Sequence, residues 1–262
     1  MKKLIAMLLV MIMAVTLFAA CGDKAASDAV SDLQKIKDKG TLVIGITEYE
    51  PMNYLDENGE WTGFDTEFAE AVAEKLGVKA EFIEIEWDNK WIELDAGNID
   101  CIWNGMTITD EANANALVSD AYVVNAQVIV TKAASAEKYA DAEGLAGAVV
   151  AAESGSAGME AGVDAGLDMA EYPLQSDAVM AVESGKADAC IIDITMAIAM
   201  TGEGTSYADL TYTGSLTEEE YGIAFRKGSD LCAEVNSIIK DLTADGTLPA
   251  LAEKYSLTLA SK

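Results

Sequence analysis

The side chains that most often perform catalysis are scarce in this 262-residue sequence. It contains no histidine and a single arginine, Arg226, against 45 aspartates and glutamates. Without histidine, neither a Ser-His-Asp triad nor a histidine-based metal site can form. These absences argue against histidine-dependent catalysis, and we expect no cofactor and no metal ion.

Asp193 lies at a position where ligands commonly bind in α/β proteins. It directly follows an apolar run, residues 189–192, which is typical of a buried strand. In open α/β sheets, ligands bind at the carboxyl ends of the strands. A carboxylate at that edge of a sheet can contact a ligand. The alternative is that Asp193 caps a helix starting at Ile194, and the two roles are compatible.

The first 20 residues have the pattern of a lipoprotein signal peptide. Lys2 and Lys3 precede an apolar run over residues 4–20, and small residues stand directly before Cys21. Lipidation of Cys21 would make it the first residue of the mature chain, and two acyl chains suffice for stable anchoring. The competing interpretation is an uncleaved anchor, because the apolar run is almost long enough to span a bilayer. We expect a signal peptide over residues 1–20, a flexible tether over 21–32 and a lipid anchor at the extracytoplasmic face of the cell membrane.

The remaining cysteines and the net charge narrow the class of protein further. Three cysteines remain besides Cys21, namely Cys101, Cys190 and Cys232. An odd number argues against a disulfide framework, so buried free thiols are expected. The formal net charge is −28, which excludes nucleic acid as a partner because phosphates would be repelled. Solubility in an exposed compartment explains such a charge, and attraction of cations to a cleft is the sharper alternative.

Strand and helix signals alternate from residue 41 onward, which predicts an α/β protein with a largely parallel sheet. Strands are expected at residues 41–47, 78–85, 100–103, 123–131, 149–152, 189–192 and 221–225. Helices are expected from about Asp65, which can serve as the cap, to Gly77, and at residues 88–96, 156–165, 177–183, 230–244 and 248–255. Asn58 and Gly59 predict a hairpin turn. Asp56 and Asn58 are spaced like calcium ligands, but the full twelve-residue calcium loop is missing.

Several segments, in order and spacing, resemble the extracellular solute-binding proteins of family 3, the substrate-binding lipoproteins of polar amino-acid ABC transporters. The segments are TLVIGIT, GEWTGFDTEFAEAVAEKLGV, GNIDCIWNGMTITDE, AQVIVTK, ESGSAG, GKADACIIDITMA and YGIAFRKGSD. The resemblance covers nearly the whole mature chain. It implies a two-lobed, periplasmic-binding-protein-like type II fold with hinge strands, which closes around its ligand.

The resemblance also implies domain boundaries and site residues. Lobe 1 would comprise residues 33–124 and 222–262, and lobe 2 residues 125–221 with the hinge ends, near 123–127 and 216–222. Tyr49 and Trp87 match an aromatic pair around the ligand side chain, and Asp193 matches the residue that binds the α-ammonium. The residues that match loops meeting the ligand's α-groups are Asn104, Gly105 and Thr107 in lobe 1 and Ser156 and Ala157 in lobe 2.

One position departs from the family pattern. The arginine that normally binds the ligand's α-carboxylate is replaced by Ala112, and Arg226 is expected to be structural. Loss of a bidentate guanidinium is a large loss for a carboxylate site. Either Lys90 and backbone N–H groups near residues 156–158 bind the carboxylate, or the ligand is an amine without one.

The leading functional hypothesis is a monomeric substrate-binding component of an ABC importer. It would capture a small amino acid or amine in a cleft and deliver it to an ABC permease in the membrane. A ligand-sensing lipoprotein is the alternative that the sequence leaves open. A cyclohexadienyl dehydratase-like enzyme is a weaker alternative. Such an enzyme must bind two carboxylates and place a proton donor, and this sequence has one arginine and no histidine. We therefore expect a binding protein rather than an enzyme.

Overall fold

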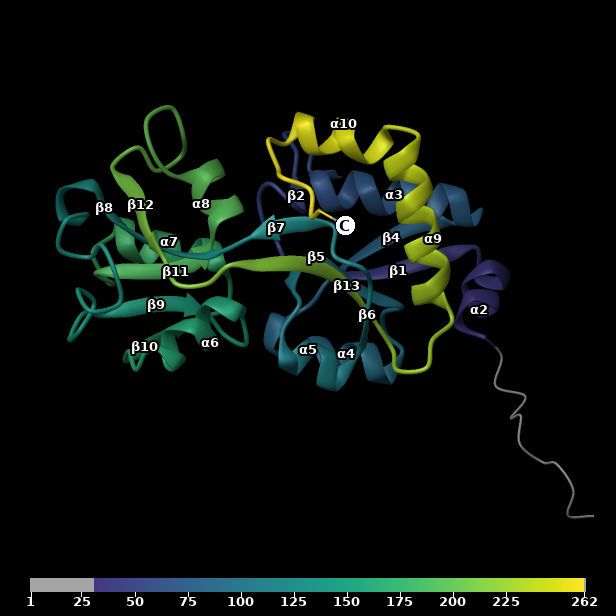
Figure 1. Ribbon diagram of the computed structural model, residues 1–262, viewed down its shortest axis with the longest axis horizontal. Helices are drawn as coiled ribbons and strands as arrows, with labels where there is room; N and C mark the ends of the chain where they lie inside the picture. Colours follow the sequence, from purple (N-terminus) through teal and green to yellow (C-terminus); the bar gives the residue numbers. More distant parts are fainter. Residues whose placement is uncertain (1–30, 262) are drawn as a thin grey trace, which may run out of the picture. The chain divides into compact units, whose positions relative to one another are not determined.

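The computed structural model describes residues 31–261. The predicted signal peptide, the lipidation at Cys21 and the tether as far as residue 30 lie outside the described residues. Within them, the long strands form two mixed sheets, each covered by helices on both faces (Figure 1). The two sheets with their helices are here called lobe 1 and lobe 2.

The sheet of lobe 1 has the strand order β4-β1-β5-β13-β6, and β7 pairs with β13. These strands are β1 (Thr41–Ile46), β4 (Lys79–Glu84), β5 (Cys101–Thr107), β6 (Leu117–Val118), β7 (Val123–Asn125) and β13 (Glu219–Phe225). The helices of lobe 1 are α2 (Asp32–Lys39), α3 (Phe64–Leu76), α4 (Lys90–Ala96) after the 3-10 turn Trp87–Asn89, α5 (Asp110–Asn115), α9 (Leu231–Ala244) and α10 (Thr247–Lys254). The predicted hairpin is confirmed as β2 (Tyr54–Leu55) paired with β3 (Trp61–Thr62).

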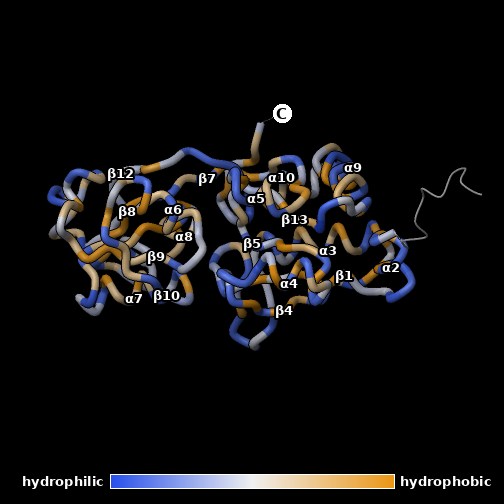
Figure 2. Tube along the Cα trace, turned by 90° about the horizontal axis from the view of Figure 1, so that it is seen from below, coloured by the Kyte–Doolittle hydropathy of each residue, from blue (hydrophilic) through white to orange (hydrophobic). Residues whose placement is uncertain are grey.

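Alternating side chains of β1 explain why helices cover both faces of this sheet. Leu42 and Ile44 pack in the cluster that includes the apolar side of α3, whereas Val43 packs with Leu94 of α4 in a second cluster. Hydrophobic residues follow central strands such as β8 and β13, and the outer loops are hydrophilic (Figure 2). The C-terminal helices, which the resemblance places in lobe 1, return to that lobe, where α9 and α10 pack against α3.

Lobe 2 has a five-stranded sheet in the order β10-β9-β11-β8-β12. Its strands are β8 (Gln127–Lys132), β9 (Val150–Glu153), β10 (Met169–Tyr172), β11 (Ala189–Asp193) and β12 (Leu210–Ser215), and its helices are α6 (Ala157–Asp164), α7 (Gln175–Glu183) and α8 (Ile194–Met200), with a 3-10 turn at Ala133–Ser135. The prediction of a largely parallel sheet is wrong for both lobes. In each lobe a strand that arrives from the other lobe, β8 or β13, pairs antiparallel with a strand of the parallel set.

The chain passes between the lobes at two adjacent places (Figure 1). β7 belongs to the lobe 1 sheet and β8, two residues later, to the lobe 2 sheet. The return runs from β12 to β13, and β13 pairs with β7 in the register Glu219↔Asn125. Two short crossings that lie side by side are the geometry a hinge requires.

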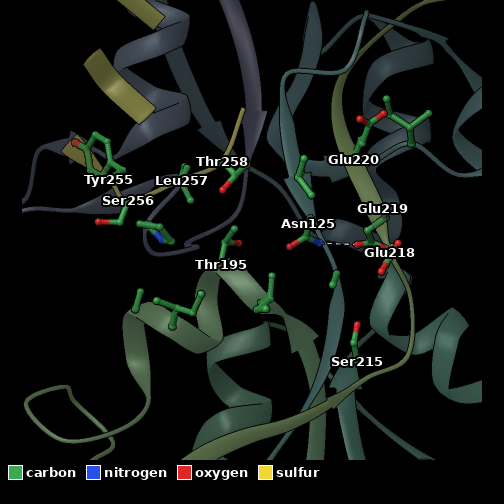
Figure 3. Close-up of a pocket in the computed structure, with 17 residues that line it drawn as sticks. Asn125, Thr195, Ser215, Glu218, Glu219, Glu220, Tyr255, Ser256, Leu257 and Thr258 are labelled. Atoms are coloured by element: carbon green, nitrogen blue, oxygen red, sulfur yellow. Dashed lines mark hydrogen bonds between the residues drawn. The ribbon is translucent and has the colours of Figure 1, made fainter. Parts of the chain in front are cut away.

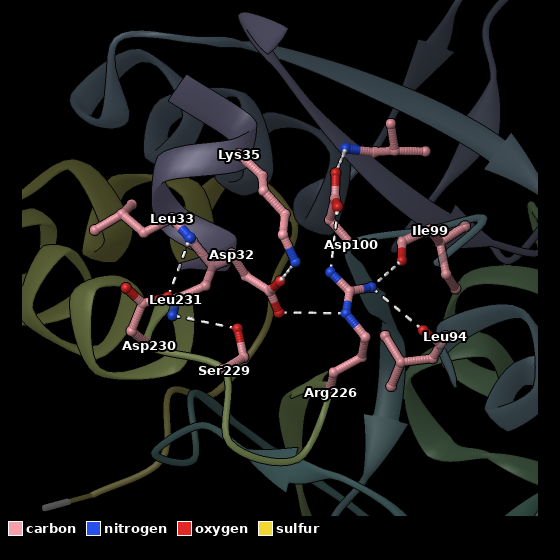
Figure 4. A network of polar contacts seen from close by, with 11 residues as sticks. Asp32, Leu33, Lys35, Leu94, Ile99, Asp100, Arg226, Ser229, Asp230 and Leu231 are labelled. Atoms are coloured by element: carbon pink, nitrogen blue, oxygen red, sulfur yellow. Dashed lines mark hydrogen bonds and ion pairs between the residues drawn. The ribbon is translucent and has the colours of Figure 1, made fainter. Parts of the chain in front are cut away.

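Arg226 has the structural role expected for it (Figure 4). Its guanidinium forms ion pairs with Asp32 at 3.2 Å and Asp100 at 3.4 Å, and it donates to the carbonyls of Leu94 and Ile99 at 3.2 and 2.6 Å. These contacts connect the starts of α2 and β5 with the end of β13. Asp32, the last residue of the predicted tether, therefore begins α2 and is bound to the lobe.

Two further predictions need correction. Asp65 does not cap α3, because the cap position is Gly63 and the Asp65 carboxylate is fully buried within the first turn. It accepts from the Gly105 N–H at 2.6 Å and the Tyr122 hydroxyl at 2.9 Å, and burial raises the pKa of Asp65 to about 7. The strand expected at residues 100–103 continues to Thr107, because β13 pairs with its second half.

Candidate ligand site

A small cavity between the lobes collects the predicted ligand-binding residues. Its volume is about 30 Å³, and all the predicted ligand-binding residues except Tyr49 line it. Lobe 1 contributes Trp87, Lys90, Trp91, Asn104, Gly105, Met106, Thr107, Thr109, Glu111 and Ala112, and lobe 2 contributes Glu153, Gly155, Ser156, Ala157, Glu160, Gln175 and Asp193. We call this space the inter-lobe cavity.

A second, larger cavity of about 970 Å³ lies along the hinge strands and contains none of the predicted ligand-binding residues (Figure 3). Its lining combines apolar side chains of α8 with residues 255–258 and residues 218–220. There Glu219 accepts from Asn125 at 2.6 Å, so this acidic group already holds the hinge strands together. The buried charges of Lys90, Glu153 and Asp193 converge instead on the inter-lobe cavity, which is therefore the candidate site.

Asp193 ends β11 and lies in the cavity wall with 5% of its surface exposed. It occupies the cap position of α8, but its side chain makes no capping hydrogen bond. Its carboxylate instead accepts from the side-chain amides of Asn125, Gln127 and Gln175, the last two at 2.8 and 2.6 Å. Because amides stabilise a carboxylate without neutralising it, the negative charge is held in place and remains available to a cation.

A second carboxylate lies close to Asp193. Glu219 accepts from the same two amides, Asn125 and Gln127, and from the Thr107 hydroxyl at 2.8 Å. Burial, followed by the charge of Glu219, raises the pKa of Asp193 well above its ordinary value, although the hydrogen bonds from Gln175 and Gln127 oppose the rise. A positive group in the cavity would relieve this repulsion.

The lobe 1 residues Asn104, Gly105 and Thr107 lie on β5 rather than in a loop. The Asn104 amide is occupied by the backbone and hydroxyl of Thr47, and the Thr107 hydroxyl by Glu219. Gly105 has a φ of +54°, and a Cβ atom there would lie 2.7 Å from the Tyr49 ring. Only glycine therefore lets the backbone of β5 pass this close to the tyrosine.

The two predicted aromatic contacts differ in position. Trp87 lines the inter-lobe cavity, whereas Tyr49 lies behind Gly105 with 2% of its surface exposed. The Tyr49 hydroxyl forms hydrogen bonds with Thr195 of α8 and with Tyr221, so Tyr49 links the two lobes in this structure. Trp91 also lines the cavity, and its indole N–H donates to Glu111 at 3.0 Å.

Ser156 and Ala157 form the start of α6 at the cavity. Ser156 is the cap residue, and its hydroxyl accepts from the Met159 N–H at 3.1 Å. The positive end of the helix dipole and the first backbone N–H groups therefore face this end of the cavity, which favours an anionic group. Ala112, buried at the start of α5, lines the same cavity and offers only a methyl group.

Besides Asp193, two buried charged residues line the cavity: Lys90, which the sequence offered as an alternative contact for a carboxylate, and Glu153, which was not predicted. Lys90 is 4% exposed, and Glu153, at the end of β9, is 3% exposed. The Glu153 Oε1 atom is buried and has no hydrogen-bond partner among the described residues. Burial, and then the charge of Asp193, raise the pKa of Glu153 to about 8, which Lys90 opposes. Sequence reasoning missed Glu153 and Gln175 because a polar residue at a strand end or a helix start is usually exposed.

The cavity is therefore lined by groups of both charge signs. Lys90 and the start of α6 offer positive charge and N–H donors, while Asp193 and Glu153 offer carboxylate oxygens. Such a site matches a small molecule that carries both an ammonium and an acceptor group. In residues 31–261, no group of histidine, cysteine, aspartate and glutamate side chains is arranged to hold a metal ion. None of the described helices combines the length and hydropathy that a membrane span requires.

Comparison with known sequences agrees with this geometry. The pattern of the bacterial extracellular solute-binding proteins, family 3, matches residues 42–258. The chain is 31% identical over 250 residues to the L-cystine-binding protein TcyJ of Escherichia coli strain K12, covering 93% of this chain and 92% of that protein.

Solved structures show the same two-lobed fold. A substrate-binding protein of an ABC uptake transporter from Streptococcus pneumoniae, with bound histidine, has a TM-score of 0.81 and 28% identity, over 89% of this chain and 100% of that one. An ancestral amino acid-binding protein, AncCDT-1, described as a precursor of cyclohexadienyl dehydratase, has a TM-score of 0.79 and 33% identity, over 86% and 99%. The family and the fold expected from the sequence are thus confirmed, and the chain belongs to the bacterial extracellular solute-binding proteins, family 3.

Proposed function

We propose that this chain captures a small amino acid or amine between its lobes and delivers it to an ABC permease. The observation that carries the proposal is Asp193, a buried carboxylate in the cavity wall whose oxygens are positioned by three amides. The relatives support an amino acid as ligand, since TcyJ binds L-cystine and the Streptococcus pneumoniae protein holds histidine.

Binding requires the lobes to separate and then close. A cavity of about 30 Å³ has room for only one or two water molecules, so a ligand must enter an opened cleft. The ligand's ammonium would contact Asp193 of lobe 2, and its remaining groups would meet Trp87 and the β5 backbone of lobe 1. A ligand that touches both lobes favours the closed form over the open one by the free energy of those contacts.

The proposal also includes a lipid anchor, and it assigns the chain no catalytic role. The related proteins named above bind amino acids, and the cavity offers no histidine and no arginine as a proton donor or carboxylate clamp. We expect a monomer, anchored through Cys21 at the extracytoplasmic face of the membrane. Cys21→Ser should release the protein from membranes or leave its precursor uncleaved, and normal cleavage with full membrane retention would contradict the anchor.

A thermal-shift screen of amino acids and amines tests the main proposal. A true ligand at a hundredfold excess over Kd should stabilise the protein by about 2.7 kcal/mol. The same compound should make the protein more compact in small-angle X-ray scattering. If no amino acid or amine raises the melting temperature, or if a tight ligand leaves the scattering curve unchanged, the proposed function is wrong.

A further inference from the structure

Lys90 carries a buried ammonium group whose bonding is incomplete. Its Nζ atom donates to the carbonyl oxygen of Gly155 at 2.8 Å, across the cavity, and to that of Trp87 at 3.3 Å. It also lies 4.9 and 5.2 Å from the ring centres of Trp87 and Trp91. An ammonium group has three N–H donors, so two carbonyls leave one donor for another acceptor.

No carboxylate of the described residues forms an ion pair with Lys90. Burial lowers the pKa of Lys90, and the more distant charges of Glu111, Glu153 and Asp88 oppose that effect. A buried charge without a direct counter-ion costs free energy that a hydrophobic side chain would avoid. The bonding of this residue therefore indicates a missing anionic partner.

Groups from both lobes surround the place where that anion would bind. Gly155, whose carbonyl Lys90 contacts, directly precedes Ser156, the cap residue of α6. An anion beside Lys90 would thus also meet the first N–H groups of α6 and the positive end of its dipole. Asp193 and the unpartnered oxygen of Glu153 lie in the same cavity and would receive the positive groups of the same molecule.

Among the residues that line the cavity, Lys90 is the one lysine or arginine. Ala112, where the family resemblance implies a guanidinium, is 1% exposed and contributes no donor from its side chain. We infer that Lys90 binds the carboxylate of the ligand from the start of α4, in place of an arginine at 112. The ligand is then an α-amino acid and not a plain amine. This inference rests on the proposed function and decides between its two ligand classes.

Paired ligands test the inference on the unmodified protein. The amino acid that gives the largest thermal shift is compared by calorimetry with its decarboxylated amine, for example histidine with histamine or cystine with cystamine. We expect the amino acid to bind about 100-fold more tightly, because truncating one partner of a buried charge pair typically costs that much or more. An amine that binds as tightly as its parent amino acid would overturn the inference while leaving the proposed function intact.

Variants then assign the preference to Lys90. Lys90→Met should weaken the amino acid about 100-fold and leave the amine unchanged or tighter, so the preference disappears. Ala112→Arg in the Lys90→Met background should restore part of the preference for the amino acid, since a guanidinium can form a bidentate pair with a carboxylate. Lys79→Met, at an exposed position of β4, is the matched control and should change neither ligand.

Three outcomes separate the possible failures. If Lys90→Met keeps the full preference for the amino acid, another group binds the carboxylate and the inference is wrong. If the Lys90→Met variant has a much lower melting temperature than the parent, the Lys90→Gln variant is used in its place. The paired-ligand comparison on the parent protein still decides the ligand class. If the parent binds neither an amino acid nor an amine, the proposed function itself fails.

Discussion

Arg226 and Lys90 are both largely withdrawn from solvent, yet their surroundings differ completely. Arg226 has two carboxylates and two carbonyls around its guanidinium, all within lobe 1 (Figure 4). Lys90 has two carbonyls, one of them from the opposite lobe, and no carboxylate among the described residues. A cation whose donors are satisfied stabilises the fold, whereas one that lacks a counter-ion is suited to bind something else.

The acidic groups show the same contrast. Burial acts to raise the pKa of Asp32, but hydrogen bonds from Lys35 and Ser229 and the charge of Arg226 hold it below its ordinary value. Asp193 is held by neutral amides, so its charge is positioned without being compensated. The comparison therefore supports a structural role for Arg226 and Asp32 and the proposed binding role of Lys90 and Asp193.

The largest expected effect is that of Asp193→Asn on binding. The substitution keeps the size of the side chain but removes its charge, so a bound ammonium would be left unpaired, at a cost of about 3–5 kcal/mol. Calorimetry with the best amino acid of the screen measures this loss. Glu183→Gln, an exposed acid at the end of α7, is the control for net charge and should bind like the parent. Equal affinities of Asp193→Asn and the parent would show that the ligand site was assigned wrongly.

Arg226→Met should lower the stability of the protein and leave its ligand affinity nearly unchanged. It leaves Asp32, Asp100 and two carbonyls without their donor, which should lower the free energy of unfolding by about 2 kcal/mol, because the network is only partly exposed. For a chain of this size we expect the melting temperature to fall by about 4–8 °C. Ligand affinity should stay within about twofold of the parent, measured well below the melting temperature. A stable variant with impaired binding would reverse the roles assigned to the two cations.

The pH dependence of stability and that of affinity should run in opposite directions. Asp65 and Glu153 have pKa values raised to about 7 and about 8, and the pKa of Asp193 is also raised, so the folded chain binds more protons than the unfolded chain. Stability therefore falls as the pH rises from about 4 to 8, and melting curves should drop by a few degrees between pH 5.5 and 8. Affinity for an ammonium should rise over the same range because Asp193 becomes charged. A melting temperature that rises from pH 5.5 to 8 would contradict the raised pKa values of these buried carboxyls.

The sequence was most informative where a local signal determines the structure. Helical spacing predicted α3 and its end at Gly77, and the Asn58-Gly59 turn predicted the β2–β3 hairpin. The second half of β5 was missed because it is extended by pairing with β13, which lies more than 100 residues later. Asp65 was misassigned because its Oδ2 atom accepts from the Gly105 N–H and the Tyr122 hydroxyl, contacts that only the tertiary fold creates.

For the site, the family resemblance singled out Asp193, and its position after an apolar strand agreed with that role. The amides that hold it come from three elements, β7, β8 and α7, and no pattern in the sequence connects them. Lys90 could be proposed only as an alternative, because a lysine at the start of a helix is normally exposed. Its burial results from the second lobe, which covers it through Gly155.

Gly155→Ala should give the smallest effect and tests how closely the lobes must approach at Lys90. A Cβ atom at Gly155 would lie 2.8 Å from the Asp88 Oδ1 atom and 3.1 Å from the Asp88 Cα atom of the opposite lobe. The Asp88 carboxylate can move, but its backbone cannot move as easily, so closure should be hindered and affinity reduced about tenfold. The φ of Gly155 is +67°, which adds a strain of about 1 kcal/mol that has nothing to do with closure.

Gly147→Ala separates these two contributions. Gly147 has a φ of +77° and nothing within 4 Å of an added Cβ atom, so its substitution introduces the same kind of strain without any contact between the lobes. Both variants should melt slightly lower than the parent, and only Gly155→Ala should bind the amino acid more weakly and compact less in small-angle scattering. If Gly147→Ala loses as much affinity as Gly155→Ala, backbone strain and not lobe contact explains the loss. The close approach of Gly155 to lobe 1 would then have no part in positioning the Lys90 ammonium.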